Sequence, residues 1–205
     1  MGVVLGILFL VIPLSVTAQN DYLLDKFFQG VKENRMEVTY SYSARVSGIV
    51  NNGEGTIASQ DAMWTVVGNG VEMYCDSKTV WIVDPIMKEV VIEPASAGAS
   101  SGFLDNPALL LSRLEENFKV TASRWLEDGK CRIYTFRPKS DMGLDYFNLE
   151  ILRSDASVRS ASFAMTDGTY VKIEVSSMKL TPKVSVEAFR SSAVFGADWI
   201  VTDLR

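Results

Sequence analysis

Residues 53–85 read GEGTIASQDAMWTVVGNGVEMYCDSKTVWIVDP, and this stretch decides the fold. It contains three strand-like runs separated by turns, and each run carries large apolar side chains on alternate residues. Successive side chains of a strand point to opposite faces of a sheet, so alternate residues share one face. The stretch therefore predicts a sheet that lines a wide apolar concavity. The sets of one parity are Trp64 and Val66, then Val71, Met73 and Cys75, then Trp81 and Val83.

The residues before this stretch predict a helix followed by a strand. Asn20 and Asp21 can cap a helix that ends near Asn34, and its apolar residues recur every three or four positions. From Met36 the period changes to two, which is typical of a half-buried strand with one wet face. Residues 51–53, Asn-Asn-Gly, then predict a hairpin turn. The apolar residues of the strand are Val38, Tyr40, Tyr42, Ala44 and Val46.

Short strands continue on both sides of one interruption. The pattern predicts them at about 57–67, 71–76, 79–84, 88–93, 119–126, 131–137, 146–152, 158–166 and 170–180. About ten or eleven antiparallel strands with two or three helices make a sheet too large to lie flat. We therefore expect a mainly β fold, an open (unclosed) antiparallel β-barrel with an N-terminal helix and a short helix on its concave side. Residues 19–205 have the length of a single domain.

The interruption is predicted to combine a flexible segment with an apolar helix. Residues 95–102 read ASAGASSG, and Pro107 then opens a short helix whose leucines include Leu110 and Leu114. By itself such a helix is most simply a surface helix packed on a sheet. A flexible segment before an apolar helix is also the arrangement of a lid. The hinge residues of that lid would be Gly98, Gly102 and Pro107.

The first residues predict export. Residues 2–14 form an uncharged apolar run that is too short to span a bilayer comfortably. Val16 and Ala18 have the small-residue spacing of a signal-peptidase site, so we expect a signal peptide at 1–18, cleavage between Ala18 and Gln19, and a soluble periplasmic product. No Lys or Arg precedes the apolar run, although signal peptides normally begin with one, and an uncleaved N-terminal anchor is the alternative.

Several parts of the chain resemble the LolA-like family, the periplasmic carriers of outer-membrane lipoproteins. Residues 53–55 match the family's Gly-x-Gly strand, Trp64 stands in its aromatic strand, and residues 75–85 resemble its Ser-Asp-Gly-Lys-Thr-Leu-Trp block before Asp-Pro. The Asn-Pro helix start at 106–107 and the ending Asp-x-Arg at 203–205 are also similar. The resemblance implies an acyl-chain carrier with a lid helix. Its implied partners are acylated lipoproteins, a releasing transporter in the inner membrane and an acceptor in the outer membrane.

The chain departs from the family pattern at residues 59–62. The family has a basic residue followed by proline there, and its arginine holds the lid closed through hydrogen bonds to the lid backbone. This chain has Ser-Gln-Asp-Ala instead, so we expect closure to depend mainly on apolar contacts of the helix.

A carrier of acyl chains needs a dry pocket with large apolar side chains. Size and parity select candidates for the cavity wall, each of which could equally be ordinary core. They are Trp64, Val66, Met73, Trp81, Val83, Leu110, Leu114, Phe136, Phe147, Leu149, Phe163 and Met165. Two alternatives remain open: a periplasmic lipid-binding sensor or regulatory domain on the same fold, and a secreted interaction protein that fills its own concavity.

Composition argues against catalysis. The chain has no histidine, which removes the commonest general base and metal ligand, so we expect no enzyme, no cofactor and no metal. Cys75 and Cys131 are either bonded to each other, as an oxidising compartment permits, or buried as free thiols inside strands, which is the commoner case. A net charge of -5 with scattered basic residues disfavours nucleic acid as a partner. We also expect the protein to be a monomer.

Overall fold

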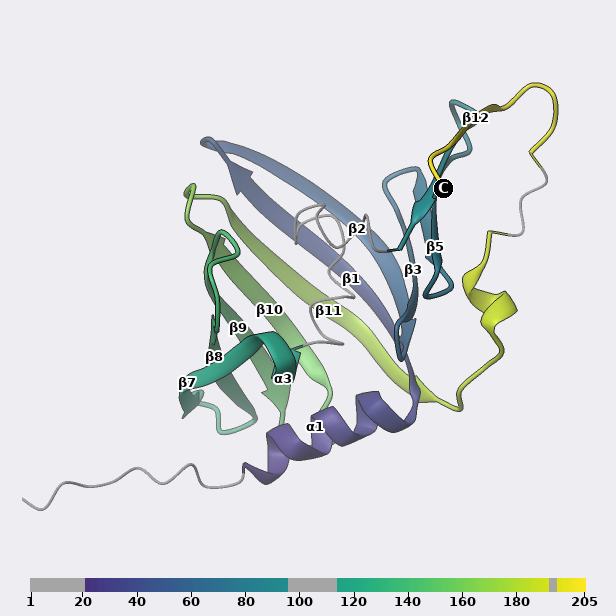
Figure 1. Cartoon of the computed structure of the whole chain (residues 1–205). Coiled ribbons are helices and arrows are strands. Elements are labelled where there is room, and N and C mark those ends of the chain that lie inside the picture. Colours follow the sequence, from purple (N-terminus) through teal and green to yellow (C-terminus); the bar gives the residue numbers. More distant parts are fainter. Residues whose placement is uncertain (1–20, 96–113, 192–194) are drawn as a thin grey trace, which may run out of the picture.

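The computed structural model describes residues 21–95, 114–191 and 195–205, which form one large curved sheet with helix α1 (Tyr22–Glu33) across one end (Figure 1). The first six strands are β1 (Arg35–Val46), β2 (Ile49–Gln60), β3 (Met63–Gly68), β4 (Val71–Cys75), β5 (Thr79–Asp84) and β6 (Glu89–Pro94). After the short helix α3 (Leu114–Asn117) come β7 (Phe118–Trp125), β8 (Cys131–Pro138), β9 (Leu144–Leu152), β10 (Val158–Met165) and β11 (Tyr170–Thr181). The 3-10 turn η1 (Val186–Phe189) and β12 (Ile200–Asp203) follow.

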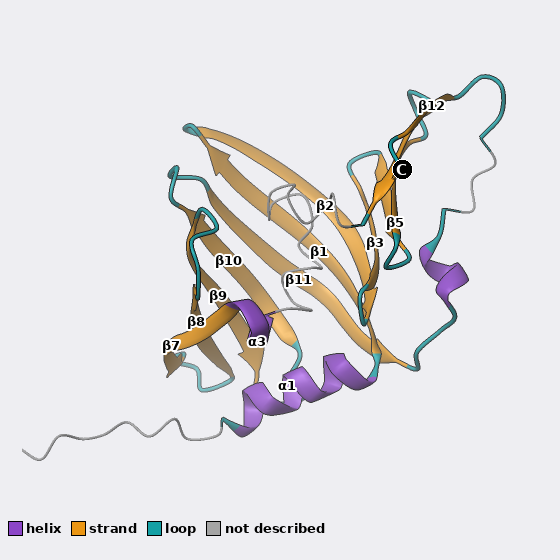
Figure 2. Ribbon diagram, in the orientation of Figure 1, coloured by secondary structure: helices purple, strands orange, loops and turns teal. Residues whose placement is uncertain are grey.

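The sheet is open. Its order is β12-β6-β5-β4-β3-β2-β1-β11-β10-β9-β8-β7, and the two edge strands β12 and β7 do not pair with each other in the described part of the chain (Figure 2). Neighbours are antiparallel except β12, which runs parallel to β6. The expected open, mainly β architecture with an N-terminal helix is confirmed. Neither α1 nor any other described helix has the length and apolar character that a bilayer-spanning helix needs.

Helix α1 begins where the sequence predicts and is tied to the sheet through its cap. The Asp21 carboxylate accepts a hydrogen bond from the Leu23 amide, which satisfies a free donor of the first turn. The same carboxylate accepts a hydrogen bond from the Tyr134 hydroxyl at 2.9 Å and pairs with Arg132 Nη1 at 2.9 Å. With the start of the helix fixed on β8, its apolar side closes one end of the concave face. The buried residues of that side are Leu23, Leu24 and Phe27.

The structure differs from the sequence-based prediction at two turns. The hairpin turn predicted at 51–53 is wrong, because these residues lie inside β2 and pair with residues 42–44 of β1. The turn is at 47–48, Ser-Gly, where both residues have positive φ (50° and 83°), as tight hairpins with right-handed twist require. The strand predicted at 57–67 is two strands, because the chain turns at 61–62 between β2 and β3.

Apolar clusters occupy both faces of the sheet. On the concave face, one cluster packs α1 and Leu114 against Phe147 and Leu149, and a second is built around Met36 and Trp64. A third cluster, which we call the convex cluster, contains Val83, Val90 and Ile92 with the partly buried Tyr74, Trp81, Phe195 and Trp199. The end of the chain therefore supplies side chains that cover the outer face of β4, β5 and β6.

Residues 182–191 fasten the convex face further. The Gln60 side chain exchanges two hydrogen bonds with the main chain of Val184, at 2.8 and 3.0 Å. Phe189 is fully buried, with the Arg35 guanidinium over its ring. These contacts bury the outer side of β2, which explains why this strand ends with buried residues of both parities.

Candidate functional site

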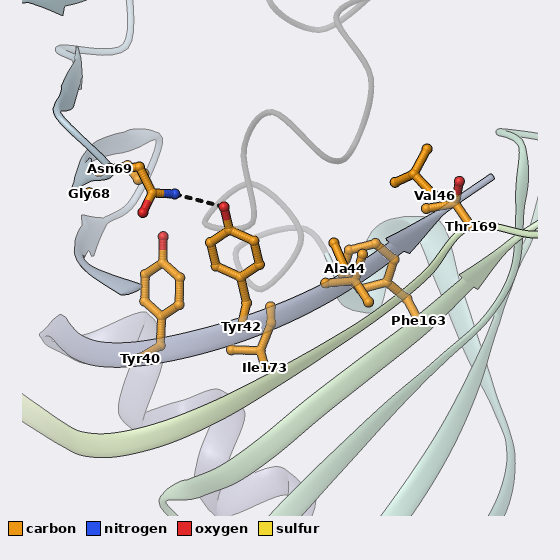
Figure 3. A pocket seen from close by; sticks show the side chains of 11 residues that line it. Tyr40, Tyr42, Ala44, Val46, Gly68, Asn69, Phe163, Thr169 and Ile173 are labelled. Atoms are coloured by element: carbon orange, nitrogen blue, oxygen red, sulfur yellow. Dashed lines mark hydrogen bonds between the residues drawn. The ribbon is translucent and has the colours of Figure 1, made fainter. Parts of the chain in front are cut away.

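The concave face holds a cavity of about 290 Å³ (Figure 3). Its walls come from β1, β3 and the β10–β11 hairpin, which the curl of the sheet turns toward one another. Eleven described residues line it: Tyr40, Tyr42, Ala44, Val46, Val66, Gly68, Asn69, Phe163, Thr169, Val171 and Ile173. None of them carries a charge. The volume is near the lower end of the range for small-ligand pockets, and the lining is mostly apolar, as in such pockets.

Two tyrosines of β1 form one wall of the cavity. Tyr40 lies opposite Gly55 in the β1–β2 register, and Tyr42 lies opposite Gly53. A Cβ atom on Gly53 would come within 2.6 Å of Tyr42 Cε1, and one on Gly55 within 2.6 Å of the Val67 carbonyl oxygen and 3.0 Å of the Tyr40 hydroxyl oxygen. Glycine at these two positions therefore leaves room for the rings across β2 and, at Gly55, for the close approach of β3. The Asn69 side-chain amide donates a hydrogen bond to the Tyr42 hydroxyl at 2.7 Å, which joins the β3–β4 turn to this wall (Figure 3).

Nine of the predicted wall residues pack on the concave side. Val66 and Phe163 line the cavity itself. Trp64 and Met73 belong to the cluster around Met36. The other five belong to the cluster under α1 or pack against it: Leu114, Phe136, Phe147, Leu149 and Met165.

Trp81 and Val83 lie on the convex face, so their prediction as cavity residues is wrong. In the β4–β5 register, Ile82 is opposite Met73 and Trp81 is opposite Tyr74. Since Met73 packs on the concave side, its partner Ile82 does too, and Trp81 and Val83 point the other way. They pack in the convex cluster, where Val83 is only 1% exposed.

The remaining predicted site residues lie outside the described part of the chain. These are Leu110, the hinge residues Gly98, Gly102 and Pro107, and the cleavage residues Ala18 and Gln19. Leu114, at the start of α3, is 1% exposed and shares a cluster with Phe27 of α1.

Both cysteines are free and buried, Cys75 at the end of β4 and Cys131 at the start of β8. Of the two alternatives for these cysteines, the structure therefore shows two buried free thiols and not a disulfide. Burial raises the pKa of Cys75; a hydrogen bond from the Ser77 backbone lowers it by less, and the charge of the neighbouring Asp76 adds a still smaller rise. Such a thiol stays protonated at neutral pH and is a poor nucleophile.

Sequence reasoning missed most of the cavity wall. The residues of β1 were recognised as one apolar strand face, but a strand pattern does not tell whether that face meets a core or a cavity. Asn69 and Thr169 are turn residues, for which no apolar pattern exists. One usable signal was present: two tyrosines spaced by two, and a Gly-x-Gly segment nearby that can lie beneath them.

The lining favours burial of hydrocarbon, with polar groups at one side. The apolar walls carry the tyrosine hydroxyls and the Asn69 amide near the β3–β4 turn. A second hollow of about 390 Å³, between α1 and residues 155–157, is lined in part by Lys26, Glu33 and Asp155, so it suits water better. Within the described residues, no group of three or more potential metal ligands occurs.

Comparisons with known proteins give a family and a fold. The family model for the outer membrane lipoprotein carrier protein LolA matches residues 69–192. No curated protein gives a significant match. An uncharacterized conserved protein from Thermus thermophilus is 14% identical, with a TM-score of 0.55 over 89% of this chain and 97% of that one, so the two share a fold. A LolA superfamily protein from Nitrosomonas europaea is 8% identical, with a TM-score of 0.45 over 83% of this chain and 96% of that one.

Proposed function

Since this chain belongs to the family of the outer membrane lipoprotein carrier protein LolA, we propose that it binds lipoprotein acyl chains on its concave face and carries them through the periplasm. Its partners are acylated lipoproteins, an inner-membrane transporter that releases them and an outer-membrane acceptor. The cavity carries the proposal, because its described lining is mostly apolar and uncharged. Such a carrier works by binding and release, as a monomer, with no reaction step.

Burial of the acyl chain supplies the energy for this role. Each methylene that leaves water contributes about 0.8 kcal/mol, so a chain of about fifteen methylenes is disfavoured in water by about 12 kcal/mol. Contact with Val66, Phe163 and Ile173 offsets part of that penalty without directed bonds. Partial and non-directional binding suits a carrier, because a site that matched the membrane's affinity would not unload.

The test places a large side chain in the cavity by substituting a small residue of its wall. In Ala44→Phe a ring projects from β1 into the space that the acyl chain would use, whereas Ser43→Phe places the same ring on the exposed, opposite side of the same strand. Native mass spectrometry of protein purified from its own envelope should show bound lipoprotein or lipid on wild type and Ser43→Phe. The bound mass should be absent from Ala44→Phe, with circular dichroism unchanged.

Delivery separates a carrier from a regulatory domain on the same fold. We expect the protein to release a lipoprotein from energised inner-membrane vesicles and to pass it to outer membranes. Binding without transfer would favour the lipid-binding sensor. Equal bound mass on folded Ala44→Phe and Ser43→Phe would show that the cavity is not the binding site.

A further inference from the structure

The polar side of the cavity contains an unused hydrogen-bond donor. Tyr40 is only 8% exposed and lines the cavity, and its hydroxyl has no hydrogen-bond partner in the described part of the chain. This hydroxyl is not sealed within protein, because the buried side-chain nitrogen and oxygen atoms without a partner in the described residues are Arg35 Nε and Arg132 Nε. It therefore opens onto the cavity, where water or a ligand can accept its hydrogen bond. A ligand atom in the cavity can supply the missing acceptor.

Tyr42 places a second hydroxyl beside the first. The two rings are 6.4 Å apart between centroids, and both hydroxyls point toward residues 68–69 (Figure 3). Tyr42 uses its oxygen to accept the hydrogen bond from Asn69, so its own proton remains free to donate. Gly53 and Gly55 lie beneath the rings, and a Cβ at Gly53 would meet Tyr42 and its partner Asn69, while one at Gly55 would meet the Val67 carbonyl first and the Tyr40 hydroxyl next.

The surroundings select a neutral acceptor. Burial and the neighbouring Tyr42 raise the pKa of Tyr40, which therefore stays protonated at neutral pH and donates. No acidic or basic side chain occurs among the described lining residues, so a carboxylate or phosphate entering here would be buried without a counter-charge. A carbonyl oxygen has the acceptor strength for two donors and carries no net charge.

We propose that Tyr40 and Tyr42 form a subsite for the carbonyl oxygen of an ester- or amide-linked acyl chain, whose hydrocarbon part lies against Phe163 and Ile173. The inference rests on the proposed acyl-binding function and adds its chemical selectivity. The site recognises neutral acyl linkages, in preference to free fatty acids and to alkyl ethers of the same length.

The test compares two ligands that differ in one carbonyl. A 1-monoacylglycerol and the 1-monoalkylglycerol ether of equal chain length, both below their aggregation concentration, compete against a fluorescent apolar probe. Wild type should bind the ester more tightly. Tyr40→Phe should weaken ester binding by about two- to tenfold, the worth of one neutral hydrogen bond, and leave ether binding unchanged. Tyr42→Phe should act in the same direction.

A matched control removes a tyrosine hydroxyl from the other face. The Tyr74 hydroxyl donates to Glu72 outside the cavity, so Tyr74→Phe should change neither affinity. Equal binding of ester and ether to wild type, equal loss of both ligands in Tyr40→Phe, or tighter binding of the free fatty acid anion would overturn the carbonyl subsite while leaving acyl binding intact. Failure of the folded wild type to bind either glyceride would overturn the acyl-binding function itself.

Discussion

Arg190 Nε donates a hydrogen bond to Asp76 Oδ2 at 2.9 Å and so ties the end of the chain to the β4–β5 turn. The Asp76 side chain is only 6% exposed, and its other oxygen accepts the amides of Lys78 and Thr79 at 3.0 and 2.9 Å. One carboxylate thus shapes a turn of the sheet and holds the segment that covers the convex face. Arg190 directly follows the buried Phe189, so the contact anchors that side chain as well.

Asp76→Asn should lower the free energy of unfolding by about 1 to 2 kcal/mol at pH 7, a modest loss because Arg190 is half exposed and screened by water. Burial tends to raise the pKa of Asp76, but the Thr79 amide, the Arg190 guanidinium and the Lys78 amide outweigh it and lower the pKa below 3.8. Because the pKa of this carboxyl is lower in the folded than in the unfolded protein, its charge stabilises the fold at any pH above the pKa in the unfolded chain. This stabilisation is lost as the pH falls toward the pKa in the folded protein. The difference between variant and wild type in urea unfolding should therefore shrink below pH 3.8.

A matched control uses the β5–β6 turn. Asp84 accepts the amides of Ile86 and Met87 at 2.9 and 2.8 Å in the same turn chemistry, but in an exposed setting. Asp84→Asn should cost less stability than Asp76→Asn. Equal losses in the two variants would show that Arg190 adds nothing to the turn.

The cap of α1 is the second stability element that we expect to be measurable. Tyr134→Phe removes a hydroxyl that donates to the Asp21 carboxylate at 2.9 Å, and hydrogen bonds to charged groups contribute about 1.5 to 3 kcal/mol. Chemical denaturation should show a loss in this range. Tyr22→Phe is the control, because Tyr22 is 79% exposed, and it should leave stability unchanged.

The face of each tryptophan predicts which one senses a ligand. Trp64 packs on the concave side beside Val66 of the cavity, whereas Trp81 packs in the convex cluster. A bromine-labelled acyl glyceride should therefore quench emission from Trp64 and spare Trp81. Trp64→Phe should abolish most of the quenching, and Trp81→Phe should preserve it. The reverse pattern would contradict the assignment of the two faces.

The error at Trp81 has a physical cause in burial on both faces. Val80 is 3% exposed on the concave side of β5, and Val83 is 1% exposed on the convex side. When both parities are apolar, size alone does not identify the inner face. The inner face is set by the register of Val80 opposite Cys75, which depends on the geometry of the intervening turn. The cover that buries Val83 comes from Phe195 and Trp199, more than a hundred residues later in the chain.

Other parts of the fold were predictable because their apolar residues all fall on one face of the strand. The alternation from Val38 to Val46 has apolar residues of one parity and polar residues of the other, and β1 follows it. The misplaced turn at 51–53 shows the opposite case. There the Asn-Asn-Gly segment has a strong local turn preference, but Gly53 serves to make room for Tyr42 across the sheet.

Export remains a prediction about residues outside the described part of the chain. We expect the mature protein to begin at Gln19, because Val16 and Ala18 have the spacing that signal peptidase needs. N-terminal sequencing of the protein from the periplasmic fraction measures this directly. A sequence beginning at Met1, or retention in membranes after a carbonate wash, would refute it.

Substitutions of Leu110 and Leu114 distinguish a movable lid from a helix that is fixed to the core. Leu114 is 1% exposed in the cluster under α1, so Leu114→Ala should lower global stability by about 2 to 5 kcal/mol. If residues 95–113 act as a lid, Leu110→Ala should leave global unfolding nearly unchanged and raise amide exchange there in the free protein, because it shifts only a local equilibrium. Acyl ligand should then slow exchange across the same residues. Strand-like protection without ligand, unchanged by Leu110→Ala, would instead mean that the helix is a fixed part of the core.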